Sequence, residues 1–122
     1  MMKTHNVKKG KAGEELAVAF LKNIGHRICK TNYQKASGEI DLITQEGDTL
    51  VFVEVKYRKN LDYGFPREAV NRTKQKRIAK TALWYIKEQQ LDDVNIRFDV
   101  IEIYYCSDGE QVINHFENAF SF

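Results

Sequence analysis

Two acidic residues, Asp41 and Glu54, interrupt the apolar runs of the segment GEIDLITQEGDTLVFVEVKYR, residues 38–58. A turn centred on Gly47 and Asp48 makes this segment a β-hairpin in which Asp41 lies directly opposite Glu54. Two ionised carboxylates about 5 Å apart repel by roughly 3 kcal/mol at an effective dielectric constant near 20. The pair therefore requires either a proton on one carboxyl group or a cation between the two.

A second opposed pair, Glu39 and Lys56, completes the charged face of this hairpin. Side chains alternate along a strand, so the four charged residues share one face with Ile43 and Phe52. The other face is predicted to hold Ile40, Leu42, Val51, Val53 and Val55. A cluster of oxygens favours Mg²⁺ or Mn²⁺ over zinc. Lys56 would stand beside such a metal, and the two positive charges suit an oxyanion that gains charge during attack at phosphorus.

The plain alternative treats the same residues as ordinary strand chemistry. Glu39 and Lys56 would form a cross-strand ion pair, while Asp41 and Glu54 would project to solvent at the edge of the sheet. The three-residue pattern ExK is common in exposed strands, so it does not decide the question by itself. The opposing aspartate, the apolar setting and the basic segment that follows favour the metal site.

Charge is distributed unevenly along the chain. Residues 56–87 hold ten Lys or Arg against two Asp or Glu, and residues 88–122 hold one against eight, within a net charge of +2. A concentrated basic segment is typical of a surface that meets phosphates. A solvated helix face explains the same charges equally well, so charge alone leaves both interpretations open.

Two helices and five strands are predicted to position these residues. Apolar spacing predicts a helix from Lys9 to about Gly25, which would bring Glu14 or Glu15 to the carboxylates if it packs across that end of the hairpin. Helical geometry does not separate these two residues. The only proline, Pro66, suits the first turn of a long basic helix that ends near Gln89. The remaining predicted strands are residues 27–33, 95–105 and 111–116.

The resulting order, α-β-β-β-α-β-β, predicts an α/β fold with a central mixed β-sheet flanked by helices. The connection from strand to basic helix to strand implies a parallel pairing, whereas the opening hairpin is antiparallel. A chain of 122 residues fits one domain, residues 1–122, in which we expect residues 1–8 to be flexible.

Several classes of protein are disfavoured by composition. No apolar run approaches the roughly 18 residues of a membrane span, and the basic N-terminus lacks an apolar h-region. We therefore expect a cytoplasmic protein with no membrane partner. Cys29 and Cys106 lack the spacing of metal ligands and are expected to be reduced, buried thiols.

Six sequence blocks in this order are typical of one family: GKAGEELA (residues 10–17), GEIDLI (38–43), VFVEVKYR (51–58), KQKRI (74–78), RFDV (97–100) and NAF (118–120). Together they resemble the bacterial YraN-like family of small uncharacterised proteins. The resemblance covers nearly the whole chain, and the combination is specific although no single block is.

That family is similar to the PD-(D/E)XK nuclease superfamily, close to archaeal Holliday-junction resolvases, which implies a restriction-endonuclease-like fold. The resemblance implies a role for each matching residue: Glu14 as the helix acid, Asp41 as the acid of the PD position, Glu54 and Lys56 as the (D/E)XK pair, and the Val55 carbonyl as a further metal ligand. Ile40 replaces the proline of the motif, which is usual for this family and removes no ligand. Glu39 is expected to support Lys56.

The expected function is a metal-dependent nuclease that binds nucleic acid and cuts its phosphodiester bonds, with DNA, including branched DNA, as substrate. Mg²⁺ or Mn²⁺ would be held by Glu14, Asp41 and Glu54, and Lys56 would position water or stabilise the transition state. An ordinary lysine pKa of about 10.4 makes Lys56 a poor base. The candidate contacts to the nucleic-acid backbone are Arg58, Arg72, Lys74, Lys76 and Arg77.

Some roles stay open at this level. Gln75 is either a site-facing amide or a helix-surface residue, and Tyr57 and Tyr63 either stack on exposed bases or pack in the protein. A nucleic-acid-binding module with a nuclease fold but no turnover is the main alternative function, and a protein-interaction module is a third. A twofold dimer would suit a symmetric junction, by analogy with resolvases.

Overall fold

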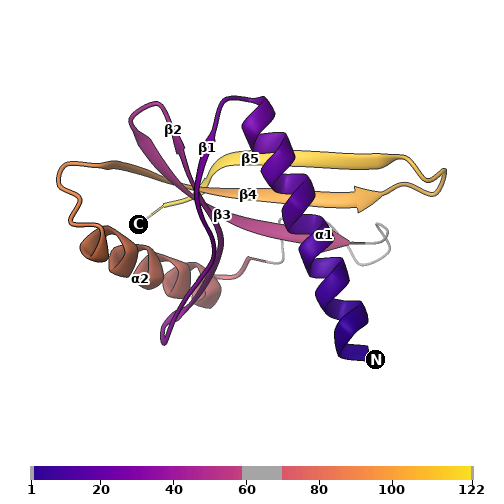
Figure 1. The fold of residues 1–122 in the computed structure, drawn as a ribbon, viewed down its shortest axis with the longest axis horizontal. Coiled ribbons are helices and arrows are strands. Elements are labelled where there is room, and N and C mark those ends of the chain that lie inside the picture. Colours follow the sequence, from indigo (N-terminus) through magenta and orange to yellow (C-terminus); the bar gives the residue numbers. More distant parts are fainter. Residues whose placement is uncertain (1, 59–69, 122) are drawn as a thin grey trace.

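The computed structural model describes residues 2–58 and 70–121, with side chains from residue 11 onward. The elements are α1 (Met2–Asn23), β1 (Arg27–Lys35), β2 (Gly38–Glu46), β3 (Thr49–Arg58), α2 (Arg72–Glu88), β4 (Asn95–Tyr105) and β5 (Gln111–Phe120) (Figure 1). The predicted element order and the α/β class are therefore confirmed.

One five-stranded sheet runs in the order β1-β2-β3-β4-β5. Strands β3 and β4 are parallel because α2 connects them, and the other neighbouring pairs are antiparallel. The register of the β2–β3 hairpin is as predicted near its turn, where Gln45 lies opposite Leu50. The mixed sheet inferred from the sequence is confirmed.

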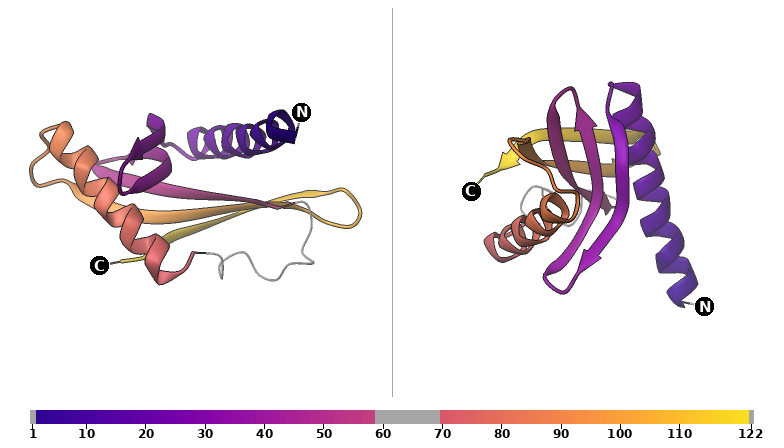
Figure 2. Two further views of the ribbon diagram at one scale, coloured as in Figure 1. Left: turned by 90° about the horizontal axis from the view of Figure 1, so that it is seen from below. Right: turned by 60° about the vertical axis from the view of Figure 1, so that its left-hand side comes forward.

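The two helices cover opposite faces of this sheet (Figure 2). On one face, Ile78 and Tyr85 of α2 pack with Phe52 of β3. On the other, Leu21 of α1 packs with Val53. Alternation of side chains along β3 therefore divides the core into two apolar layers, one under each helix.

Ile40 lies on a different face from the one predicted. It packs in the cluster under α2 with Phe52 rather than with Leu42, which lies under α1. The described β2–β3 register begins at the pair Leu42 and Val53, and before it β2 pairs with β1, where Ile40 faces Tyr33. The side chains of residues 40 and 42 lie on different faces because this first part of β2 pairs with β1 and not with β3, and it follows β1 toward α2.

Both helices begin at positions other than those predicted. Helix α1 begins at Met2 rather than Lys9 and ends at Asn23, before Gly25, whose φ of +100° gives the predicted left-handed stop. Helix α2 begins at Arg72 because Asn71 caps it, with its side chain accepting a hydrogen bond from a backbone amide of the first turn. The predicted start at Pro66 lies outside the described residues.

The strand limits and the burial of the cysteines differ in part from the predictions. Strand β4 matches its predicted limits, β1 extends beyond residue 33 to Lys35, and β5 extends beyond residue 116 to Phe120. Cys29 and Cys106 are free thiols, but each is half-buried rather than buried as predicted. Within the described ranges, no helix is long and apolar enough to cross a membrane.

Gly13 sets how closely α1 approaches β3. A Cβ atom built on Gly13 would lie 3.1 Å from Tyr57 Cβ, which is tighter than an ordinary carbon contact. Tyr57 Cβ is fixed to the strand backbone and cannot swing away. The absence of a side chain at Gly13 therefore lets the first helix, and the adjacent Glu14, lie close to the sheet.

We expect Gly13→Ala to destabilise the protein by about 1 kcal/mol, because the added methyl group pushes α1 from Tyr57. Helix propensity alone would instead stabilise the Gly13→Ala variant by roughly 0.5–1 kcal/mol. Urea unfolding measures the difference, and Ala19→Gly at an exposed position of α1 calibrates the propensity of this helix. An increase in stability in Gly13→Ala would contradict the close contact.

Candidate active site

The site forms where β2 leaves β3. The backbone N–H of Val55 donates a hydrogen bond of 2.8 Å to Asp41 Oδ2. A continued antiparallel ladder would place the backbone of Ile40 opposite Val55, but the described ladder ends at Leu42 and Val53. The Asp41 carboxyl group therefore takes the place of a backbone partner and is held between the two strands.

Asp41 and Glu54 meet at this point, as the hairpin pattern suggested. Their side chains share a hydrogen bond, and only 7% of Glu54 is exposed. Burial, together with the hydrogen bond and charge of Glu54, raises the pKa of Asp41 to about 9. In the absence of a metal, a proton on Asp41 therefore relieves the repulsion between the two carboxyl groups.

Two lysines, Lys56 and Lys74, offset the negative charge of Glu54. Lys74 Nζ lies 3.0 Å from Glu54 Oε2. Burial alone would raise the pKa of Glu54, but the hydrogen bond with Asp41 and the Lys74 ammonium lower it overall. Burial and the nearby Lys74 amine lower the pKa of Lys56. Burial would do the same to Lys74, but its contacts with Lys56 and Glu54 raise its pKa.

Asp41 also belongs to an acidic group with Glu14 and Glu39. One carboxylate oxygen from each of Glu14, Glu39 and Asp41 lies within 4.8 Å of the others. Glu14 Oε2 also accepts a hydrogen bond of 2.9 Å from Asn32 Nδ2. Three converging carboxylate oxygens are the kind of donors that Mg²⁺ or Mn²⁺ prefers, so this group fits the cation expected from the sequence.

Glu39 therefore has different neighbours from those expected. In the sheet it pairs with Gln34 of β1, and its carboxylate joins Glu14 and Asp41. The expected pairing of Glu39 with Lys56 does not occur in the described β2–β3 register. The cause is again the departure of β2 from β3, which carries Glu39 away from the strand that bears Lys56.

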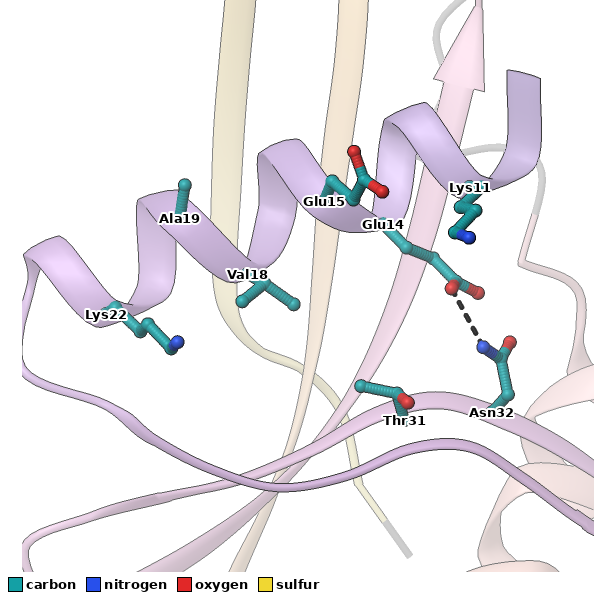
Figure 3. A pocket seen from close by; sticks show the side chains of 8 residues that line it. All are labelled: Lys11, Glu14, Glu15, Val18, Ala19, Lys22, Thr31 and Asn32. Carbon is teal, nitrogen blue, oxygen red and sulfur yellow. Dashed lines mark hydrogen bonds between the residues drawn. The ribbon is translucent and has the colours of Figure 1, made fainter. Parts of the chain in front are cut away.

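Glu14 and Glu15, which helical geometry could not separate, face different surroundings. Figure 3 shows Glu14 directed toward Asn32 of β1, while Glu15 points away from that strand. Both line an open cavity of about 640 Å³ between α1 and β1. Of these two residues, only Glu14 belongs to the acidic group. Glu14 is also the residue that the family resemblance implies as the helix acid.

A second cavity, of about 420 Å³, opens onto the Asp41–Glu54 pair from the α2 side. Its lining residues come from the start of β2 and the first turns of α2: Gly38, Glu39, Asp41, Glu54, Asn71, Thr73, Lys74, Arg77 and Ile78. Arg77 thus borders the site, as a contact to a phosphate would require. Arg72 and Lys76 are exposed on the same helix, and Arg58 is half-buried at the end of β3.

Three other predicted residues have structural contacts. Gln75 donates a hydrogen bond of 3.0 Å from Nε2 to the Val70 carbonyl, so its amide holds the segment before α2 rather than the site. Tyr57 packs against Gly13 and Tyr105, which supports packing over base stacking. Val55 contributes its N–H to Asp41, while its carbonyl as a metal ligand stays a prediction. Tyr63 lies outside the described residues.

Sequence reasoning missed two members of the site. Nothing in the sequence pattern marks Asn32, whose left-handed φ of +50° is a conformation that asparagine tolerates well and that changes the direction of a side chain within a strand. Lys74 was expected to contact a nucleic-acid backbone, whereas it forms an ion pair with Glu54 inside the site. The helix pattern could not show this because Lys74 is one of many basic residues in α2.

Comparison with known proteins shows the family of this chain. The model of the uncharacterised protein family UPF0102 matches residues 13–103, which include every acidic and lysine residue of the site. The chain belongs to the UPF0102 family. This confirms the YraN-like resemblance at the level of the family.

Close relatives within UPF0102 cover nearly the whole chain. A UPF0102 protein of Alkaliphilus oremlandii is 48% identical over 117 residues, covering 94% of this chain and 99% of the relative. One of Syntrophus aciditrophicus is 44% identical over 120 residues, covering 96% of this chain and 94% of the relative. Each alignment therefore spans nearly the full length of both this chain and the relative.

The raised pKa of Asp41 gives a pH-dependent stability. In the unfolded chain this carboxyl group titrates near pH 4, so between about pH 4 and 9 the folded protein holds a proton that the unfolded chain lacks. The stabilisation from that proton is complete below about pH 4 and is lost as the pH rises toward 9.

We expect Asp41→Asn to be more stable than the wild type in a chelator-containing buffer, because asparagine has no proton to lose and can still accept from Val55 N–H. The difference should grow by up to about 1.4 kcal/mol for each pH unit between about pH 4 and 9. Urea unfolding at several pH values measures it, with the exposed Glu15→Gln as control. A difference that does not change with pH would contradict the buried, protonated Asp41.

Proposed function

We propose that this protein is a metal-dependent phosphodiesterase that cuts nucleic acid, with DNA as its expected substrate. One observation carries the proposal: Asp41 belongs to an acidic group with Glu14 and Glu39 and also contacts the buried Glu54, beside which lie Lys56 and Lys74. The resemblance of the sequence blocks to the PD-(D/E)XK nucleases supports the same conclusion. The restriction-endonuclease-like fold and the link to resolvases remain part of this proposal.

The donor set suits a divalent cation that prefers oxygen. Glu14 and Asp41 would hold it, together with Glu39 or Glu54, and the Val55 carbonyl is the further ligand implied by the resemblance. When bound, Mg²⁺ or Mn²⁺ lowers the pKa of a bound water and neutralises charge on the scissile phosphate.

The residues of the chain then have distinct tasks. Asp41 is oriented by the Val55 N–H, so its remaining oxygen atom has a defined direction. Lys56 and Lys74 place two amines beside Glu54, where they can stabilise an oxygen that gains charge. The lowered pKa of Lys56 also favours proton transfer from its ammonium group.

A specific observation favours the alternative, a binding module without turnover. The negative charge of the Asp41–Glu54 pair is already compensated without a cation, because Glu54 pairs with Lys74 and Asp41 carries a proton. A degenerate site that keeps its fold would have the same balance. A cleavage assay separates the two functions.

A substrate panel tests the proposal directly. We expect cleavage of at least one of duplex, single-stranded, flapped or four-way-junction DNA, or RNA, with Mg²⁺ or Mn²⁺. Asp41→Asn and Lys56→Ala should each lower the rate by about 100-fold or more, whereas Glu15→Gln should not. Binding without cleavage by the wild type would favour the binding module. Absence of binding at low salt would exclude both functions.

A calorimetric titration with Mn²⁺ tests the ligands independently of cleavage. We expect Asp41→Asn and Glu14→Gln to weaken binding by about tenfold or more, because each removes an oxygen donor. Comparing Glu39→Gln with Glu54→Gln identifies the third ligand. Glu15→Gln is the matched control on the same helix, and unchanged affinity in Asp41→Asn would contradict the proposed centre.

The state of assembly follows from the substrate. A twofold dimer is the form we expect if the substrate is a four-way junction, because that substrate is itself symmetric. Size-exclusion chromatography with light scattering, with and without the junction, measures the mass of the complex. A single copy bound to each junction would contradict the dimer without affecting the active site.

A further inference from the structure

Helix α2 exposes a large aromatic side chain away from the core. Trp84 is the only tryptophan of the chain, and 48% of its surface is exposed. The neighbouring residues in the sequence, Ala82 and Tyr85, are buried against the sheet, so Trp84 lies on the outer side of the helix. Core packing therefore does not explain a tryptophan at this position.

The surroundings of Trp84 are positively charged. A shallow cavity of about 280 Å³ is lined by Ser37, Lys80, Leu83, Trp84 and Lys87. Lys87 Nζ lies 5.6 Å from the centre of the indole ring. An exposed ring between lysines is the combination with which proteins hold single-stranded nucleic acid, since the ring stacks on a base and the cations meet phosphates.

This cavity adjoins the active-site cavity at the β1–β2 turn. Ser37 lines the Trp84 cavity, and the next residue, Gly38, lines the cavity that opens onto Asp41. Ser37 Oγ lies 2.7 Å from Thr81 Oγ1 of α2, so the β1–β2 turn rests on the helix between the two cavities. Figure 1 shows this turn projecting beyond the sheet on the side of α2.

Helical spacing aligns the charged residues with the ring. Arg77, which lines the site cavity, precedes Trp84 by seven residues, and Lys80 lies between them. Seven residues are about two helical turns and roughly 10 Å, so Arg77 and Trp84 lie on the same side of the helix. That length corresponds to about three nucleotide steps at 3.4 Å per step.

We propose that Trp84 stacks on an unpaired base of the substrate strand, while Lys80 and Lys87 hold the phosphates next to that base. The active site would then select nucleic acid with an unpaired base within a few nucleotides of the bond that is cut. A fully paired duplex hides the faces of its bases and would lack this contact. The proposal rests on the proposed function for its location, but stacking can be measured without cleavage.

Fluorescence of the single tryptophan reports stacking directly. In Asp41→Asn protein without divalent metal, titration with a short single-stranded oligonucleotide should quench the Trp84 emission, and a blunt duplex should quench it much less. Anisotropy of a labelled oligonucleotide gives the affinity. We expect Trp84→Ala to weaken single-strand binding by about 5- to 100-fold and Trp84→Phe to restore most of it. The matched control is Ile96→Ala, with a similar exposure of 42% on β4.

The outcomes separate this inference from the proposed function. Quenching by the single strand that is much weaker with a blunt duplex, together with weaker single-strand binding in Trp84→Ala, supports stacking even if no substrate is cut. Unchanged single-strand affinity in Trp84→Ala overturns it, even if the wild type cuts DNA. A change of oligomeric state in Trp84→Ala with unchanged nucleic-acid affinity also overturns it and makes this face a protein interface.

Discussion

The hydrogen bond from the Val55 N–H to the Asp41 carboxyl group, 2.8 Å long, is the contact on which the site depends. It occupies a backbone donor that would otherwise continue the β2–β3 ladder. Strand β2 is thereby free to follow β1 toward α2, which brings Glu39 to Asp41 and seats the β1–β2 turn on Thr81. A side chain in place of a backbone partner thus ends one strand pairing and opens the cavity beside it.

A second buried cluster shows what a structural arrangement of charges looks like in this protein. Asp99 is fully buried, yet it accepts hydrogen bonds from Arg97, His115 Nε2 and the Asn118 backbone. Burial alone would raise the pKa of Asp99, but these donors lower it overall. Each oxygen there has its partner and the carboxylate stays ionised, which is the behaviour of a charge that serves the fold.

The Asp41 pair behaves differently. Asp41 and Glu54 are two acidic groups in contact, and Asp41 keeps a proton at neutral pH because of burial and Glu54. An amide in place of Asp41 would remove the need for that proton. Carboxyl groups whose pKa is shifted this strongly by burial and a second carboxyl group concentrate at functional sites. The contrast with Asp99 therefore supports a functional rather than structural role for the Asp41 pair.

Local pattern alone determined much of this protein: the element order, the parallel crossover through α2, and the hairpin register that pairs Gln45 with Leu50. These follow from apolar periodicity and turn chemistry, which act between residues close in the chain. The meeting of Asp41 with Glu54 followed from the same register. Tertiary structure alone decided that Glu39 joins Glu14 and that Lys74 binds Glu54. Those contacts depend on where β2 bends and how each helix crosses the sheet, and packing between distant segments sets both.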